Sequence, residues 1–221
     1  YQGEEQNFGD IDGRIRAGAI IQNLGPKIKY DESGRETFLP TNLRIGGGFD
    51  FLLDQYNTVS VTAEVNKLLV PTPPILGREY NFSDINENGV YDDGIDELGE
   101  LVSTDPVIYQ GQSADVDFMS GIFQSFSDAP GGFSEELKEF TWALGAEYKY
   151  DDSFALRAGY FNESEEKGAR KFLALGAGFK FSGTKVDLSY LFSASKVPSP
   201  LENTLRFSLT FDFGSNQYLE Y

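Results

Sequence analysis

The feature that most constrains this chain is a two-residue alternation of apolar and polar side chains. It is clearest over 140–150, where Phe140, Trp142 and Leu144 share one parity and Glu147 and Lys149 lie on the other. Alternation of this kind predicts a β-strand with one apolar face, and about ten residues suffice for a tilted strand to cross a bilayer. The same pattern predicts seven further strands, at 12–22, 41–52, 56–68, 153–161, 171–181, 185–193 and 203–213.

The charges inside these segments fall on one parity. Arg14 and Arg16, for example, lie opposite Ile15, and Arg157 lies opposite Leu156. The other charges that obey the rule are Arg44, Asp50, Glu64, Lys180, Asp187, Arg206 and Asp212. Lys67 is the exception, and its place at a strand end predicts a side chain that snorkels toward water. The alternation therefore predicts a sheet with one apolar and one charged face.

Two architectures fit such a sheet, namely a membrane β-barrel and a soluble β-sandwich. Aromatic residues gather near strand ends, as they do in the interfacial girdles of barrels; the pairs are Tyr148 and Tyr150, Phe179 and Phe181, and Phe211 and Phe213. The charged parity is also rich in glycine, which suits a crowded or curved barrel interior. We therefore expect an all-β protein, a transmembrane antiparallel β-barrel, with the sandwich as the alternative.

The connections between the predicted strands alternate strictly in length. Those near 53–55, 151–153 and 182–185 are short, whereas 23–40, 69–139, 162–170 and 194–202 are longer. Bacterial outer-membrane barrels have short periplasmic turns and long extracellular loops. The alternation thus places the long loops outside the cell, with the longest, 69–139, inserted between two strands.

Composition excludes several kinds of function. The chain of 221 residues has no histidine and no cysteine, so it cannot build an imidazole or thiolate zinc site, a Ser-His-Asp triad or a disulfide framework. Its net charge of −17 argues against nucleic acid as a partner, because Lys and Arg supply most of that affinity. Glu64 and Glu147 on the charged parity are expected to form structural ion pairs with arginines rather than an acid/base site.

The acidity is concentrated in the long loop, since residues 79–137 contain 14 carboxylates and no Lys or Arg. The loop contains an Asp-x-Asn-x-Asn-Gly frame, which places oxygen ligands two residues apart before a glycine turn. The candidate calcium ligands are Asp84, Asn86, Asn88, Val90, Asp92, Asp93 and Asp96. Position twelve of an EF-hand would require Glu, and here it is Ile95. A solvated acidic turn without metal is the alternative.

The second half of this loop has apolar residues at helical spacing, following Asp117 as a potential cap. The candidate partner-binding residues are Phe118, Met119, Ile122, Phe123, Phe126 and Phe133. Exposed Phe and Met clusters are typical of interaction sites. The alternative is a short amphipathic helix that packs inward as a lid.

Four segments resemble the PorV family of the type IX secretion system of Bacteroidetes. They are IIQNLGPK (20–27), FMSGIFQSFSDAPGGFSEELKEFTWALGAEY (118–148), RAGYFNESEEKGARKFLALGAG (157–178) and LENTLRFSLTFDF (201–213). The resemblance implies a FadL-like outer-membrane barrel with fourteen strands when complete. About eight are visible here, so the chain is expected to be the C-terminal portion of that barrel.

The resemblance also implies function and partners. Such a protein would bind the C-terminal signal domain of secreted cargo, associate with the SprA (Sov) translocon barrel and pass cargo to an attachment complex containing PorU. It would sit in the lipid bilayer of the outer membrane, act without catalysis and require no cofactor, apart from calcium if the acidic loop binds it. The alternatives are a FadL-like channel for hydrophobic small molecules and a soluble sugar- or calcium-binding β-sandwich.

Overall fold

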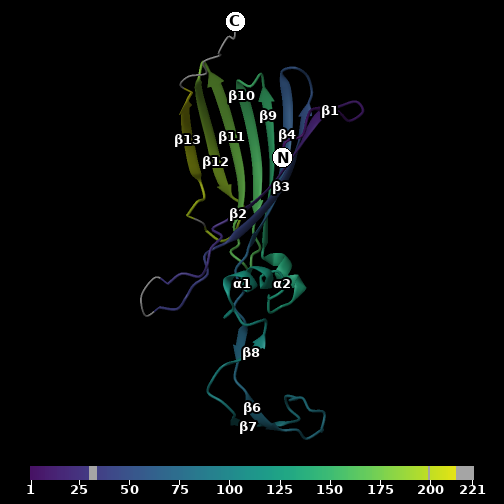
Figure 1. Ribbon diagram of the computed structural model, residues 1–221, viewed down its shortest axis with the longest axis vertical. Helices are drawn as coiled ribbons and strands as arrows, with labels where there is room; N and C mark the ends of the chain where they lie inside the picture. Colours follow the sequence, from purple (N-terminus) through teal and green to yellow (C-terminus); the bar gives the residue numbers. More distant parts are fainter. Residues whose placement is uncertain (30–33, 199, 213–221) are drawn as a thin grey trace. The chain divides into compact units, whose positions relative to one another are not determined.

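Most of the chain's strands form one antiparallel sheet, seen in the computed structural model of Figure 1. The structure describes residues 1–29, 34–198 and 200–212. Within them, neighbouring strands follow the order β1-β2-β3-β4-β9-β10-β11-β12-β13. Their bounds are β1 Gln6–Asn7, β2 Asp12–Gln22, β3 Asn42–Leu52, β4 Asn57–Leu68, β9 Phe140–Tyr150, β10 Phe154–Asn162, β11 Lys171–Phe181, β12 Thr184–Ser193 and β13 Thr204–Phe211.

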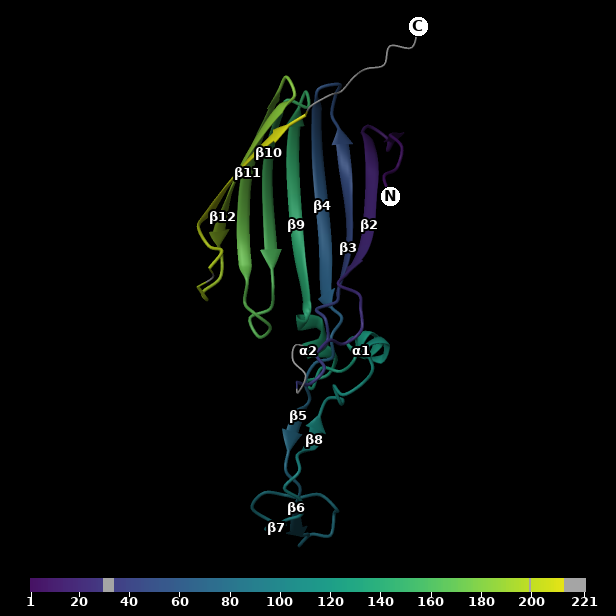
Figure 2. The same cartoon turned by 60° about the vertical axis from the view of Figure 1, so that its left-hand side comes forward.

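The eight strands predicted from alternation are confirmed, three with the predicted bounds and the others with bounds that differ by one or two residues. The end of the segment predicted at 203–213, including Phe213, lies outside the described residues. Strand β1 was not predicted, because two residues are too few to show alternation; Gln6 and Asn7 pair with Gly13 and Asp12. Figure 2 shows the long strands side by side.

The register confirms the predicted faces. Residues directly opposite one another in antiparallel strands point to the same side of a sheet. Arg14 pairs with Asp50, and Asp50 pairs with Ser60 on the next strand. On the other side, Ile15 pairs with Phe49, which pairs with Val61. One face therefore carries the charges and the other the apolar side chains, except at strand ends, where Lys67 and Lys171 lie on the apolar side.

In the described part of the chain, no second sheet covers the apolar face. Its exposed side chains come from every long strand and include Ile15, Ile45, Val61, Val65, Leu144, Leu156, Leu173, Leu175, Leu188, Leu205, Phe207 and Leu209. Among the described residues the buried apolar side chains are few, namely Leu69, Ala129, Ala155, Ala169 and Phe172. A sandwich would bury its inner faces against each other, so this arrangement does not fit the sandwich alternative.

Two adjacent left-handed residues close each of two tight hairpins on the sheet. Asp151 and Asp152 have φ of 47° and 48°, and Ser182 and Gly183 have φ of 46° and 79°. Paired positive φ values give hairpin turns whose twist matches that of the flanking strands. The short connections predicted from the sequence are thus confirmed. In the described residues β1 and β13 do not pair with each other, so the fold is a large open antiparallel sheet of nine strands.

The chain divides into two units, and the second is formed by 24–41 and 69–137, here called the insert. Sheet-forming residues make up the first unit, 1–23, 42–68 and 138–221. The insert contains two small ribbons, in which β5 Ile75–Gly77 pairs with β8 Val107–Gln110 and β6 Tyr80–Ser83 pairs with β7 Glu97–Leu101. Helix α1 spans Phe118–Gln124, and α2, Phe133–Lys138, ends at the border of the two units. In the described part of the chain, no helix has the length and apolarity to cross a membrane.

Candidate functional site

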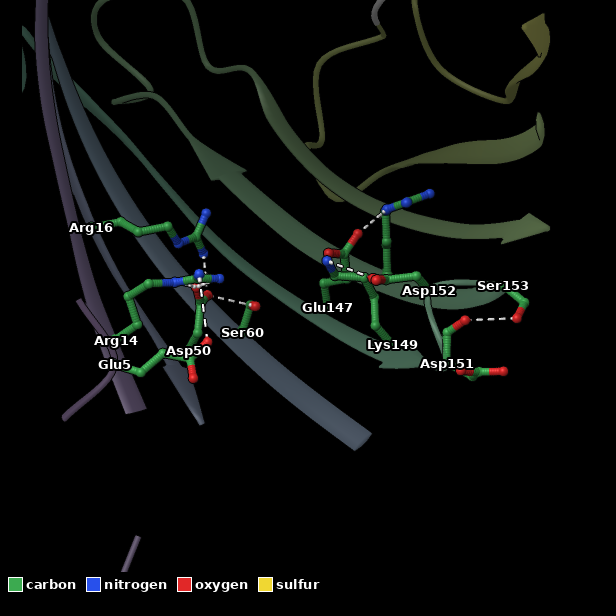
Figure 3. A network of polar contacts seen from close by, with 11 residues as sticks. Glu5, Arg14, Arg16, Asp50, Ser60, Glu147, Lys149, Asp151, Asp152 and Ser153 are labelled. Atoms are coloured by element: carbon green, nitrogen blue, oxygen red, sulfur yellow. Dashed lines mark hydrogen bonds and ion pairs between the residues drawn. The ribbon is translucent and has the colours of Figure 1, made fainter. Parts of the chain in front are cut away.

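The charged face of the sheet is organised by two ion-pair clusters. In the first, Arg14 Nε lies 3.2 Å from Asp50 Oδ2, and Arg16 Nη2 lies 2.8 Å from Asp50 Oδ1. The hydroxyl of Ser60 donates to Asp50 Oδ1 at 2.7 Å. Figure 3 shows these groups converging on the Asp50 carboxylate, which is only 3 % exposed. Two arginines and a hydroxyl thus compensate a buried charge, as its desolvation requires.

The second cluster centres on Arg157. Its guanidinium binds Glu147 through Nε and Asp187 through Nη1, the latter at 2.7 Å. The neighbouring Gly178 leaves space for this side chain, because a Cβ there would lie 2.9 Å from Arg157 Nη1. Glu64 lies 3.8 Å from Arg44. The expected ion pairs of Glu64 and Glu147 are confirmed, and the glycines of this face make room for arginines that lie along it.

Lys67 corrects a prediction made from the sequence. It was expected to snorkel toward water, yet it is 1 % exposed, and its Nζ lies 2.8 Å from Glu139 Oε2. The ammonium also lies 4.9 Å from the centre of the Phe140 ring. Lys167 binds the other oxygen of Glu139 at 3.1 Å. A carboxylate and an aromatic face hold this charge, a pairing across β4 and the start of β9 that alternation cannot reveal.

Asp117 caps helix α1 as predicted. Its Oδ1 accepts hydrogen bonds from the backbone N–H groups of Met119, at 3.0 Å, and Ser120, at 3.1 Å. The Ser120 hydroxyl donates to Oδ2, and these contacts hold the pKa of the Asp117 carboxyl below its usual value. The cap satisfies two of the N–H groups that a helix start leaves unpaired.

Helix α1 divides the predicted partner-binding residues between two sides. Gly121 is buried, and a Cβ on it would lie 2.6 Å from the Phe38 ring, so this side of the helix packs within the insert. Phe118 and Ile122 are half-buried. Met119, Phe123 and Phe126 are exposed, Phe123 by 70 %. Met119 and Phe123, four residues apart, share one face of α1, and Phe126 lies two residues beyond its end.

Phe133, at the start of α2, is 77 % exposed. The exposed members of the predicted cluster are thus Met119, Phe123, Phe126 and Phe133, hereafter the α1 surface. The sequence predicted the cluster but could not separate its inward half from its outward half.

The candidate calcium ligands form a turn that is hydrogen-bonded within itself. Asp84 accepts from the N–H groups of Asn88, at 3.2 Å, and Gly89, at 2.6 Å. Asp96, which is buried, accepts from the N–H groups of Ile85 and Asp92 at 2.8 and 2.7 Å. These contacts are those of an acidic turn stabilised by its own backbone.

In the same turn, the side-chain amides of Asn86 and Asn88 point their nitrogen atoms toward Asp92. Asn86 and Asn88 both donate through Nδ2 to Asp92 Oδ2, at 2.7 and 2.6 Å. Val90 is exposed and donates its N–H to Asn88 Oδ1 at 2.8 Å, and Asp93 is exposed. Calcium binding would require both amides to turn their oxygens inward, since Ca²⁺ takes oxygen ligands. The calcium site therefore stays a prediction.

Comparison with known families gives a match to the model described as type IX secretion system protein PorV, over residues 1–75. The matched part includes β1 to β4 and the segment 20–27, and it confirms the resemblance seen in the sequence. The segments 118–148, 157–178 and 201–213 lie outside the matched residues. No curated protein matches the chain. The PorV family is a component of a secretion system and not an enzyme, and it suggests the outer membrane as location.

Proposed function

We propose that this chain, as a relative of the PorV family, is an outer-membrane component of the type IX secretion system that handles secreted cargo. It would bind the C-terminal signal domain of cargo, associate with the SprA (Sov) translocon and pass cargo to the attachment complex containing PorU. The observation that carries the proposal is the family match over residues 1–75. The specific partners come from the resemblance of the sequence to that family.

The uncovered apolar face of the sheet supports the membrane location. Its long strands have 8 to 12 residues, and most of them reach the length that a tilted strand needs to span the hydrocarbon core. Burying a Leu or Phe side chain from water contributes about 1.5–3 kcal/mol, so a bilayer against this face stabilises the fold strongly. If water contacted the same face, these side chains would stay exposed and would not contribute this free energy.

The charged face argues against the alternative of a channel for hydrophobic small molecules. In a barrel this face would line the lumen, since the apolar face would contact lipid. The Asp50 and Arg157 clusters lie on it and would present charges to an apolar solute. A passage for such solutes would instead need apolar lining residues.

The α1 surface is the proposed docking site for cargo or translocon. It consists of exposed Phe and Met side chains. Central aromatic anchors contribute about 2 kcal/mol or more each to a complex. A rigid cap at Asp117 and the packing of Gly121 against Phe38 hold these side chains outward. Such a preformed surface loses little conformational entropy on binding.

The test is the double substitution Phe123→Ser with Phe126→Ser in the full-length protein. We expect binding of cargo or translocon to weaken about a thousandfold while the barrel assembles normally. Tyr109→Ser is the matched control, because Tyr109 is also an exposed aromatic residue of the insert. Co-purification with SprA measures binding, and heat-modifiable gel mobility measures folding. Normal folding with undiminished co-purification would exclude the α1 surface as the docking site.

We further propose calcium as a ligand of the acidic turn. Asp84→Ala together with Asn88→Ala should abolish any calcium-dependent rise in melting temperature and leave the sheet unchanged, because both residues belong to the insert. Differential scanning calorimetry with calcium and with chelator measures the effect. An identical melting temperature of the parent protein in both conditions would remove calcium from the proposal.

A further inference from the structure

The ribbon formed by β6 and β7 has one apolar and one polar face. Tyr80 pairs with Leu101 and Phe82 with Leu98, with a register shift between the two pairs, and the extra residue on β7 lets both leucines lie on the side of Tyr80 and Phe82. All four are exposed, Leu98 by 57 %. Ser83 pairs with Glu97 on the opposite face. Tyr91, from the turn between the strands, packs edge-on against Phe82, with ring centroids 5.8 Å apart.

A ribbon of this kind is incomplete as a folding unit. Two-stranded hairpins are marginally stable in water, and an apolar face normally requires a further strand, a helix or a partner to cover it. In the part of the chain that the structure describes, β6 and β7 pair only with each other. The exposed quartet therefore has the composition of a contact surface rather than that of a loop surface.

The charges around the quartet determine which partner can cover it. Residues 79–105 contain nine carboxylates and no Lys or Arg, namely Glu79, Asp84, Glu87, Asp92, Asp93, Asp96, Glu97, Glu100 and Asp105. A second copy of the chain would bring another nine negative charges to the contact, and anionic lipid headgroups would be repelled in the same way. A protein surface that combines apolar residues with Lys and Arg would match both the apolar quartet and the carboxylates around it.

We infer that the β6–β7 ribbon is a docking surface for a protein partner with a basic, partly apolar face. The apolar quartet supplies the contact area, and the carboxylates attract the partner and select it by charge. The ribbon is composed of residues other than those of the α1 surface, so this inference does not depend on that surface binding cargo.

The experiment is photo-crosslinking from both faces of the ribbon in cells that express the full-length protein. Phe82→p-benzoylphenylalanine and Leu98→p-benzoylphenylalanine place the probe on the apolar face, and the first keeps an aromatic ring. Asn81→p-benzoylphenylalanine and Ser83→p-benzoylphenylalanine are the matched controls outside the quartet. Only variants with native heat-modifiable mobility are compared, and Phe82 serves as the conservative position if Leu98 disturbs folding.

We expect the apolar-face probes to give one protein adduct at least about fivefold more strongly than the controls. Mass spectrometry should map the adduct to a partner segment with more Lys and Arg than Asp and Glu. Glu97→Gln with Glu100→Gln should lower the yield severalfold, whereas Asp115→Asn, elsewhere in the insert, should not. Equal yields from all positions, no adduct, an adduct with a second copy or with lipid, or insensitivity to the Glu97 and Glu100 changes would each overturn the inference.

Discussion

The sheet and the insert satisfy their charged groups in different ways. On the sheet, charges from different strands neutralise one another, as Arg14, Arg16 and Asp50 do across β2 and β3. In the insert, carboxylates bind nearby backbone N–H groups, as Asp84 and Asp117 do within five residues of themselves. Ion pairs between residues far apart in the sequence therefore stabilise the sheet. Within the insert, residues 79–105 carry nine carboxylates and no Lys or Arg, so this segment has a strongly negative charge of its own.

The largest expected effect tests the long-range pairing of the sheet. Asp50→Asn leaves Arg14 and Arg16 without their shared carboxylate, and breaking such a buried pair should destabilise the protein by about 3–5 kcal/mol. Asp12→Asn, an exposed carboxylate at the end of the same sheet, should change stability by less than about 0.5 kcal/mol. Urea unfolding in lipid vesicles measures both. Equal midpoints would show that the pairing contributes nothing to the sheet.

The next effect separates the two faces of the sheet. Leu175→Arg places a charge on the apolar face and should cost about 2–4 kcal/mol near the membrane midplane. Ser208→Arg places the same charge on the opposite face, where Ser208 pairs with Asp187, and should be much milder. The same vesicle unfolding assay compares them. A reversed order would mean that the charged face contacts lipid.

The smallest effect concerns the local contacts of the insert. Asp117→Ala removes the cap of α1 and should destabilise the helix by about 1 kcal/mol. Asp115→Ala, two residues earlier and outside the cap, is the control. Hydrogen exchange at the amides of Met119, Ser120 and Gly121 should quicken in the first variant, with no change in the β9 amides. Faster exchange in β9 as well would show that the insert and the sheet are energetically coupled.

The same contrast explains what the sequence could predict. Alternation persists over about ten residues in each long strand, so strand positions, parity and the ion pairs of Glu147 and Glu64 followed from it. The strands of the insert have three to five residues and a register shift in each ribbon, which leaves no period to detect. The apolar quartet of the β6–β7 ribbon was missed for this reason, although the acidity around it was evident.

The sequence also could not predict which side chains of α1 are buried. The helical spacing of 118–126 predicted α1, but which residues face inward depends on Phe38, some 80 residues away, packing on Gly121. The burial of Lys67 depends likewise on Glu139, a contact between residues 72 apart. Pairings of this separation require the tertiary structure, whereas the Asp117 cap, made within three residues, did not.

The Lys67–Glu139 pair has a consequence for how this fold can change. It joins the end of β4 to the start of β9, and these two strands are direct neighbours, with Lys67 opposite Phe140. The two points at which the connection 69–139 leaves and rejoins the sheet are thus already side by side, as at the end of a β-hairpin. The entropic cost of closing such a connection grows only slowly with its length, by about 0.6 kcal/mol for each doubling. Connections of very different length and sequence can therefore replace 69–139 without disturbing the sheet. New binding surfaces can thus arise at this position while the strands stay the same.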